Sequence, residues 1–295
     1  MSTPISRRSA ITKAAGATAL IAASSRITSR LNAADAPETA KLKGNINHSA
    51  CRWCYDKIQL DDLCDALKKM GLHAIDLLGP SDFPTLKKHD LICSMVHGVP
   101  GGIPQGLNRL ENHDKIVEYF ERDMPLVAEA GYPNMICFSG NRKGMSDEQG
   151  LENCAIGAKR IAALADKHKV TVCMELLNSK VNHADYMCDH SAWGVELCKR
   201  VGSEYFKLLF DIYHMQIMEG DIIHTIRDHH QHFGHYHTGG IPGRHEIDDS
   251  QELHYPAVMR AIVKTGYKGY VAQEFNPTGN DPLGSLKKCV GICDV

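Results

Sequence analysis

The chain has 295 residues, of which 43% are hydrophobic and 23% are charged, so it can bury the core of one large α/β domain. Its formal net charge of −2 offers no basic face that would mark nucleic acid as the main partner. The 11 cysteines are odd in number and irregularly spaced, which does not match a disulfide framework.

The N-terminal segment differs from the rest of the chain because its first 34 residues include basic residues and no acidic one. Residues 6–13 (SRRSAITK) resemble a twin-arginine export signal, and an alanine-rich apolar stretch, too short for a membrane anchor, follows. We therefore expect residues 1–36 to be a twin-arginine-type signal peptide and linker, and residues 37–295 to be the folded domain of an exported, periplasmic protein. A basic leader without function is the alternative.

Short apolar runs alternate with segments of helical periodicity along the rest of the chain. The runs are typical of buried parallel strands, and glycines after the periodic segments indicate where helices stop. Ser146, with Gln149 three residues later, matches a capping box at the start of a helix. The predicted strands cover residues 42–47, 73–78, 91–96, 134–138, 170–175, 208–211, 233–237 and 270–274. The predicted helices cover residues 60–70, 81–88, 112–130, 147–168, 191–201, 219–230, 255–265 and 282–293.

Eight strand–helix units in roughly 260 residues are close to the ~250 residues of a typical (β/α)8 barrel. We therefore predict an α/β fold with a single (β/α)8 TIM barrel. A doubly wound open sheet is the alternative, since alternation alone does not prove closure. The absence of a dinucleotide-type glycine fingerprint after the first predicted strand counts against it.

Four predicted strands end on a residue that can bind a metal, at separations of 36, 26 and 37 residues. In a barrel the carboxyl ends of all strands meet on one rim, so we expect these side chains to converge. A salt bridge or a helix cap explains any one of them alone, but the four together favour a metal site. Three carboxylates and one imidazole suit Mg²⁺ or Mn²⁺, with Co²⁺ as a further candidate. The four residues are Glu175, Asp211, His237 and Glu274.

A metal that binds adjacent carbonyl and hydroxyl oxygens of a substrate acidifies the C–H bond beside the carbonyl and stabilises the resulting enediolate. Carboxylates on either side can then remove a proton from one carbon and return one to its neighbour. Glu175 and Glu274 are suited to this acid/base role.

Three further residues are candidates for contacts with the substrate. Arg244 offers a planar fork for a carboxylate or another oxygen, with a surface salt bridge to Glu246 as the alternative. His214 lies three residues after Asp211 and is predicted to contact substrate or to support the metal site. His97 ends a predicted strand and precedes a Gly- and Pro-rich loop of the kind that binds substrates in barrels.

Four segments resemble the hydroxypyruvate isomerase branch of the xylose isomerase-like barrel superfamily. The similarity extends from about residue 43 to the end of the chain, and its most specific parts are Asp-x-Tyr-His-x-Gln and Pro-Gly-Arg-His-Glu. The resemblance implies a TIM barrel, one divalent metal, and interconversion of hydroxypyruvate and tartronate semialdehyde through an enediolate. The segments are residues 174–178 (MELLN), 211–216 (DIYHMQ), 235–246 (HYHTGGIPGRHE) and 273–277 (QEFNP).

The same resemblance implies roles for individual residues. It places the acid/base pair on Glu175 and Glu274, and substrate contacts on His214 and Arg244. Hydroxypyruvate isomerases commonly have Gln where this chain has His237, whereas the related ketose 3-epimerases have His. A sugar 3-epimerase or isomerase of the same fold is therefore the alternative, and the export signal also favours it. The implied metal ligands are Glu175, Asp211, His237 and Glu274.

Two other functions share parts of this pattern. Metal-dependent endonucleases acting at abasic sites are similar at the candidate ligands but need an Asp-x-His after the seventh strand, where this chain has Pro-Gly-Arg-His-Glu. A non-catalytic sugar-binding barrel predicts a missing ligand or acid/base residue, and none is missing. We therefore predict a metal-dependent isomerase acting on a small hydroxy-keto acid or sugar, with no nucleic acid partner and no membrane anchor. Assembly into a homo-oligomer is left open.

Overall fold

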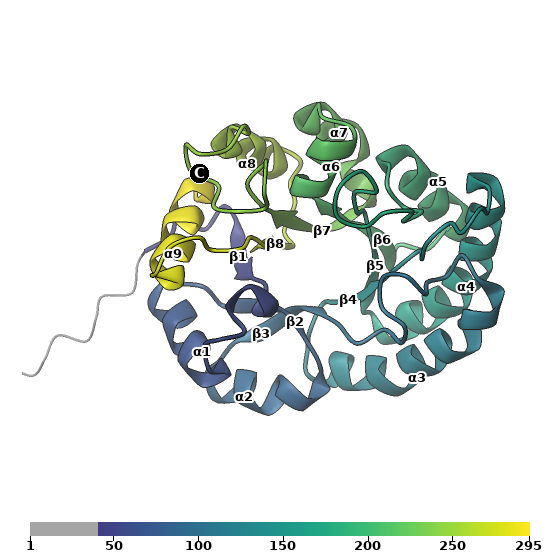
Figure 1. Ribbon diagram of the computed structural model, residues 1–295. Coiled ribbons are helices and arrows are strands. Elements are labelled where there is room, and N and C mark those ends of the chain that lie inside the picture. Colours follow the sequence, from purple (N-terminus) through teal and green to yellow (C-terminus); the bar gives the residue numbers. More distant parts are fainter. Residues whose placement is uncertain (1–40) are drawn as a thin grey trace, which may run out of the picture. The chain divides into compact units, whose positions relative to one another are not determined.

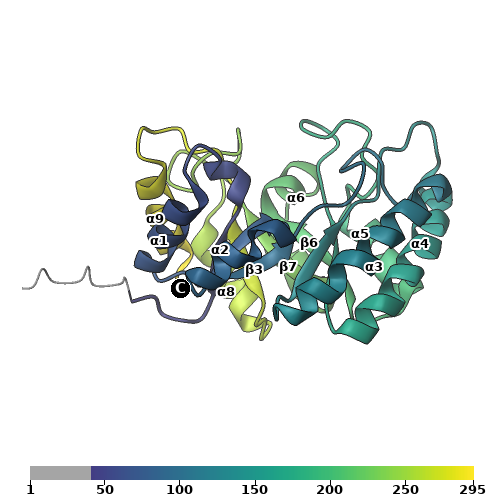
Figure 2. The same cartoon turned by 90° about the horizontal axis from the view of Figure 1, so that it is seen from below.

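The computed structural model describes residues 41–295, so the signal peptide and linker predicted over residues 1–36 lie outside the described residues. Within the described part, eight parallel strands form one sheet in the order β1-β8-β7-β6-β5-β4-β3-β2. The sheet curls into a ring with helices outside it (Figures 1 and 2). An isolated bridge between Cys51 and Asp76 joins the two edge strands, β1 and β2. This arrangement confirms the predicted (β/α)8 barrel.

The strands are short and almost wholly buried, because helices cover one side and the barrel interior the other. In β5, for example, only Thr171 is partly exposed. This double burial explains why continuous apolar runs, rather than alternating ones, marked the strands in the sequence. The strands are β1 (Asn47–Ala50), β2 (Ala74–Leu78), β3 (Ile92–Val96), β4 (Asn134–Cys137), β5 (Thr171–Glu175), β6 (Phe206–Asp211), β7 (Phe233–Thr238) and β8 (Tyr270–Gln273).

The helices return the chain from the end of one strand to the start of the next. At the start of α4, Ser146 Oγ accepts a hydrogen bond of 3.2 Å from the backbone N–H of Gln149, which agrees with the predicted cap. The α-helices are α1 (Leu60–Lys69), α2 (Phe83–Lys88), α3 (His113–Glu129), α4 (Asp147–His168), α5 (Ser191–Val201), α6 (Ile212–Met218), α7 (Ile222–His229), α8 (Tyr255–Lys264) and α9 (Pro282–Cys293). Short 3₁₀ helices cover Arg52–Tyr55, Pro80–Asp82, Leu110–Asn112 and His230–His232.

The predicted first strand, residues 42–47, is wrong. This segment is irregular: Gly44 has a φ of +78°, and the backbone N–H and Nζ of Lys43 both bind Asp294 near the end of the chain. The first strand is instead the short segment β1, which pairs in register with β8. The apolar pattern at 42–47 is too weak to distinguish a strand from a loop that is held by contacts with Asp294.

The helix predicted over residues 219–230 is also incomplete. It corresponds to α7, but a separate helix, α6, starts directly after β6. Asp211 caps α6, since its Oδ1 accepts a hydrogen bond of 3.1 Å from the backbone N–H of His214. The cap places the last residue of β6 and the first turn of α6 side by side, and this contact shapes the site described below.

The cysteines are all free, and all except Cys54 are buried, in agreement with the expectation that they form no disulfide framework. Among residues 41–295, no helix combines the length and the hydrophobicity needed to cross a bilayer.

Candidate metal centre

Four neighbouring strands, β5 to β8, bring the four candidate ligands to one place. Glu175 and Asp211 are the last residues of their strands, His237 is the last but one of β7, and Glu274 directly follows β8. Parallel pairing sets Asp211 of β6 directly beside His237 of β7. One ligand atom from each of the four buried residues lies within 4.8 Å of those of the other three. Residues far apart in the sequence therefore form one compact cluster that can hold a metal ion.

His237 provides the clearest sign that this cluster fits a cation. Its Nδ1 lies 2.8 Å from Glu274 Oε2, 3.6 Å from Glu175 Oε1 and 4.0 Å from Asp211 Oδ2. Although Glu274 Oε2 is within hydrogen-bonding distance, this buried nitrogen makes no hydrogen bond of acceptable geometry among the described residues. A buried imidazole nitrogen without a well-formed hydrogen bond and three carboxylates facing it together form a donor set for a divalent metal.

Ionising all three buried carboxylates at once is energetically unfavourable without a nearby positive charge. Burial raises the pKa of Asp211 to about 8, although Arg244 acts in the opposite direction. Burial also raises the pKa of Glu175. For Glu274, burial again acts to raise the pKa, but Arg244 and His237 outweigh it and hold the pKa well below its ordinary value. A divalent cation at this point would stabilise the charged form of all three carboxylates.

Arg244 lies over the cluster and supplies part of that counter-charge. Its Nη2 is 2.5 Å from Glu274 Oε2 and 3.3 Å from Asp211 Oδ2, and its guanidinium lies between the rings of Trp53 and Tyr213. The surface salt bridge with Glu246, which the sequence had left open, is not formed. Instead, the Glu246 carboxylate accepts hydrogen bonds from the loop after β8 and from α9.

His214 lies behind Asp211 and does not line the cavity. The backbone and side-chain N–H groups of Asn178 lie 3.2 and 2.6 Å from its Nδ1, so this nitrogen accepts and Nε2 carries the hydrogen. Nε2 is 3.6 Å from Asp211 Oδ2. Burial and the nearby Arg244 keep the pKa of His214 well below its ordinary value, so the ring is neutral. Its geometry is that of a support for Asp211 rather than of a group facing substrate.

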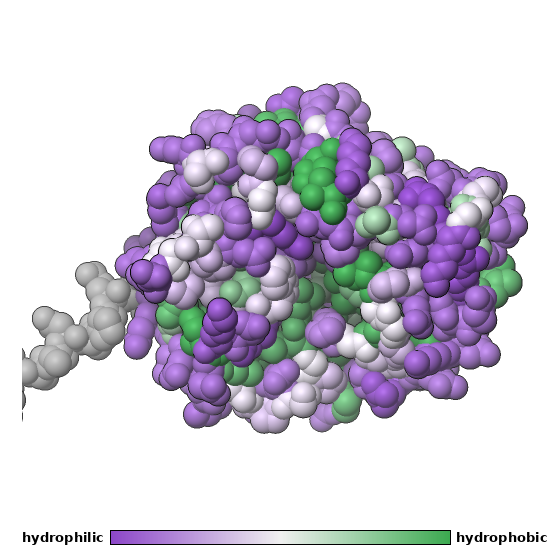
Figure 3. Space-filling model, viewed as in Figure 1, coloured by the Kyte–Doolittle hydropathy of each residue, from purple (hydrophilic) through white to green (hydrophobic). Residues whose placement is uncertain are grey.

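A cavity of about 310 Å³ opens above the cluster, and the predicted residue His97 lies on its wall. Glu175, Glu274 and Arg244 face this cavity, whereas Asp211 and His237 lie beneath it. The face of the barrel seen in Figure 1 has a central hollow with apolar surface inside it (Figure 3). The remaining lining residues are Trp53, Leu77, Ile103, Ile136, Phe138, Leu177 and His183.

Sequence reasoning missed Trp53 and His183. The Trp53 indole N–H donates a hydrogen bond of 2.7 Å to Glu274 Oε1, and the His183 ring packs 5.3 Å from that of His214. Trp53 lies between Cys51 and Cys54 and His183 lies in a polar loop, and neither position has a local motif that marks a role in the site.

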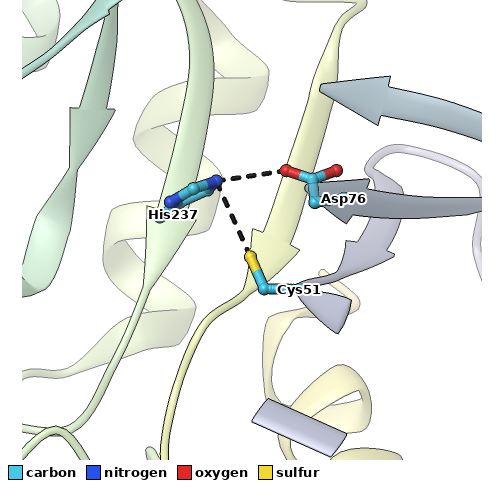
Figure 4. Close-up of side chains that lie close together, drawn as sticks. All are labelled: Cys51, Asp76 and His237. Carbon is cyan, nitrogen blue, oxygen red and sulfur yellow. Dashed lines mark hydrogen bonds and ion pairs between the residues drawn. The ribbon is translucent and has the colours of Figure 1, made fainter. Parts of the chain in front are cut away.

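Asp76 of β2 was also missed, and it lies directly behind His237. Its side chain is fully buried, and its Oδ2 is 3.1 Å from His237 Nε2 and 2.6 Å from His235 Nε2. Burial acts to raise the pKa of Asp76, but His235 and His237 outweigh it and lower the pKa below its ordinary value. Cys51 Sγ is 3.8 Å from the same His237 nitrogen. Figure 4 shows that this nitrogen contacts both Asp76 and Cys51. In the sequence, the position of Asp76 inside the apolar run AIDLL was the one indication that this aspartate is buried in a strand.

Comparisons with known proteins agree with this architecture. A family model described as a xylose isomerase-like TIM barrel matches residues 64–288. The 2-oxo-tetronate isomerase of Cupriavidus necator is 35% identical over 143 residues, which cover 48% of this chain and 53% of that protein. The 2-oxo-tetronate isomerase of Pectobacterium atrosepticum is 25% identical over 238 residues, which cover 76% of this chain and 89% of that protein. The chain spans about half the length of two curated relatives that it matches, 52% and 53%.

Solved structures share the fold. A structure described as an AP endonuclease of family 2 from Brucella melitensis superposes with a TM-score of 0.72 at 24% identity, covering 81% of this chain and 96% of that one. Other solved structures with this fold are sugar epimerases. At these identities the likeness shows a common fold alone.

Proposed function

The chain belongs to the xylose isomerase-like TIM-barrel family, and on this premise we propose that it catalyses a metal-dependent isomerisation through an enediolate. Its curated relatives are named isomerases, which supports an enzymatic function. The observation that carries the proposal is His237 Nδ1, which makes no well-formed hydrogen bond among the described residues and faces three buried carboxylates at the floor of a cavity.

Four residues would hold the metal in this proposal, and Mg²⁺ and Mn²⁺ are the ions that suit mainly oxygen ligands. A divalent cation there supplies Lewis acidity, which polarises a substrate carbonyl and stabilises negative charge on adjacent oxygens. All four ligands are buried, so the protein shields them from most of the bulk solvent. The proposed ligands are Glu175, Asp211, His237 and Glu274.

Glu175 and Glu274 are the proposed acid and base. Of the three carboxylates in the cluster, these two face the cavity, so only they can reach a carbon-bound proton of a substrate in it. One carboxylate removes the proton beside the carbonyl, and a carboxylate returns a proton to the adjacent carbon. Trp53 and Arg244 each bind one oxygen of Glu274, which fixes the orientation of this carboxylate.

A small hydroxy-keto acid is the first substrate candidate. Support comes from the hydroxypyruvate isomerase-like segments of the sequence and from relatives named 2-oxo-tetronate isomerase. The cavity of about 310 Å³ lies at the lower end of the ~300–1,000 Å³ range of small-molecule pockets, which suits a substrate of modest size.

A neutral ketose is the second candidate, and one observation favours it. Arg244 is the only lysine or arginine among the described residues that line the cavity, and Asp211 and Glu274 already bind it. The three carboxylates of the cluster would be balanced by Arg244 and one divalent cation, which leaves no surplus positive charge for a substrate carboxylate. The apolar part of the wall also suits the C–H face of a sugar.

Solvent-deuterium incorporation tests both candidates. Metal-free protein is incubated in D₂O with hydroxypyruvate, 2-oxo-tetronate and several ketoses, with Mg²⁺, with Mn²⁺, and with chelator. Metal-dependent exchange at the carbon beside the carbonyl supports the enediolate reaction, and the fastest substrate identifies the class. If Mn²⁺ binds but no compound exchanges, the enediolate proposal fails for this panel of acids and ketoses.

A further inference from the structure

Behind His237, a buried hydrogen-bond network spans the barrel. The Asp76 carboxylate on β2 is fully buried and meets four side-chain donors from β1, β3 and β7. Its Oδ1 accepts hydrogen bonds from Ser49 Oγ (2.8 Å) and Ser94 Oγ, and its Oδ2 faces His235 Nε2 and His237 Nε2. An ionised carboxylate has about four acceptor positions. The four donors occupy all of them, so the carboxylate has one stable orientation.

This network determines which nitrogen of His237 carries the hydrogen. A carboxylate without a proton can only accept, so the 3.1 Å contact with Asp76 requires a hydrogen on His237 Nε2. In the neutral ring, Nδ1 then keeps its lone pair, and Nδ1 is the nitrogen that faces Glu175, Asp211 and Glu274. Figure 4 shows the His237 ring with one nitrogen directed at Asp76 and Cys51 and the other directed away from them.

We propose that Asp76 is a positioning residue which holds the hydrogen of His237 on Nε2 and thereby keeps Nδ1 free to bind the metal. Ser49, Ser94 and His235 in turn hold the carboxylate. Partners of this kind behind a metal-binding histidine typically contribute ~10–100-fold to metal affinity. The proposal rests on the metal role of His237 proposed above, and it adds a residue that contacts neither substrate nor metal.

A second metal ion is the competing explanation of the same cluster. One ligand atom from each of Cys51, Asp76 and His237 lies within 4.8 Å of those of the other two, close enough to share an ion. However, His235 Nε2 lies 2.6 Å from the same Asp76 oxygen, so hydrogen bonding accounts for the Asp76 and His237 contacts without an ion. The two explanations differ in the number of ions bound and in the effect of removing Cys51.

The test measures Mn²⁺ binding by calorimetry in metal-free, full-length protein, for the wild type, Asp76→Asn and a matched control, Asp189→Asn. Asp189 is also a buried aspartate that accepts from a histidine, His190, but it lies outside the cluster. We expect one Mn²⁺ per wild-type chain, a ~10–100-fold weaker affinity in Asp76→Asn, and unchanged affinity in Asp189→Asn. Long-range ¹H–¹⁵N NMR of the His237 ring, recorded at a pH at which the ring is neutral, should show the hydrogen on Nε2 in the wild type and a mixture of tautomers in Asp76→Asn.

Each outcome decides between the explanations. Wild-type affinity and an unchanged His237 tautomer in Asp76→Asn overturn the positioning role while leaving the metal site intact. Two ions in the wild type, one of them lost in Cys51→Ala, overturn it in favour of a second metal site. A wild type that binds no Mn²⁺ overturns the metal site and this inference together. If Asp76→Asn does not fold, Ser94→Ala, which removes one donor to Asp76, replaces it and should weaken Mn²⁺ binding several-fold.

Discussion

The indole N–H of Trp53 donates a hydrogen bond of 2.7 Å to Oε1 of Glu274, joining the segment after β1 to the end of β8. The other oxygen of Glu274 contacts Arg244 at 2.5 Å. Glu274, one of the two proposed acid/base residues, is therefore held from two sides by residues that lie far apart in the sequence.

Replacing Trp53 by Phe should lower kcat/KM by roughly 10–150-fold, because a hydrogen bond to a charged group contributes about 1.5–3 kcal/mol and its loss frees the carboxylate to rotate. Steady-state kinetics with the best substrate from the exchange panel measures the effect. Trp193 is the matched control, since its indole N–H donates to a backbone carbonyl, that of Asp147, outside the cavity. Trp193→Phe should change stability without changing kcat/KM. Equal kinetic losses in both variants would show that the Trp53 contact has no specific role.

Replacing Glu274 by Gln should reduce turnover by ~10²–10⁴-fold, because the amide can neither accept a proton from the substrate nor return one to it. The far-ultraviolet circular dichroism spectrum should stay unchanged, since Gln keeps the size of the side chain. Glu246→Gln is the control: this carboxylate binds the loop after β8 and α9, and its replacement should affect stability alone. Full activity in Glu274→Gln would remove Glu274 from the mechanism.

The metal-free protein should lose stability as the pH rises from about 6.5 to about 8. Burial raises the pKa of Asp211 to about 8, far above the ~3.9 of an unfolded aspartate. In this pH range the folded state therefore binds one proton that the unfolded state does not, and the free energy of unfolding falls as the pH rises towards about 8. Bound Mn²⁺ compensates the carboxylate charge, so the gain in Tm on adding Mn²⁺ should increase over the same range. Scanning calorimetry with chelator and with Mn²⁺ measures both.

Asp211→Asn provides the control for this pH dependence, since it has no proton to lose. Its metal-free Tm should fall less steeply than that of the wild type between about pH 6.5 and 8. The remaining decrease comes from His237, because burial acts to lower the pKa of this histidine but Cys51, Glu274 and Asp76 outweigh it and raise the pKa above its ordinary value. His214 does not contribute to the pH dependence between about pH 6.5 and 8. Its pKa is lowered, so its protonation changes the stability only below its ordinary pKa of 6.5. A wild-type Tm that rises with pH in this window would contradict the raised pKa of Asp211.

We also propose that the N-terminal segment directs export by the twin-arginine route. Replacing both Arg7 and Arg8 by Lys should retain the protein in the cytoplasm, because this route reads the arginine pair and not the charge alone. Cell fractionation followed by immunoblotting measures the distribution. Arg26→Lys with Arg30→Lys, the same change farther along the segment, should leave export unchanged. Unaltered export of the Arg7, Arg8 variant would assign the segment to another route or to none.

The sequence by itself determined the barrel and the candidate ligands. Strands buried on both faces appear as continuous apolar runs, and parallel strands place their carboxyl ends on one rim, so a strand-end position in sequence specifies a place in space. For this reason Glu175, Asp211, His237 and Glu274 could be identified as a group without knowing any contact between them.

Only the tertiary structure decided which other side chains meet that group. Asp76 reaches His237 across the barrel interior from β2 to β7, over 161 positions of sequence, and Trp53 reaches Glu274 over 221. Such contacts depend on barrel closure and on which strand residues point inward, and neither leaves a periodic or local signal. Arg244 shows the same limit, because its neighbour Glu246 suggested a local salt bridge, whereas folding places its guanidinium on Asp211 and Glu274.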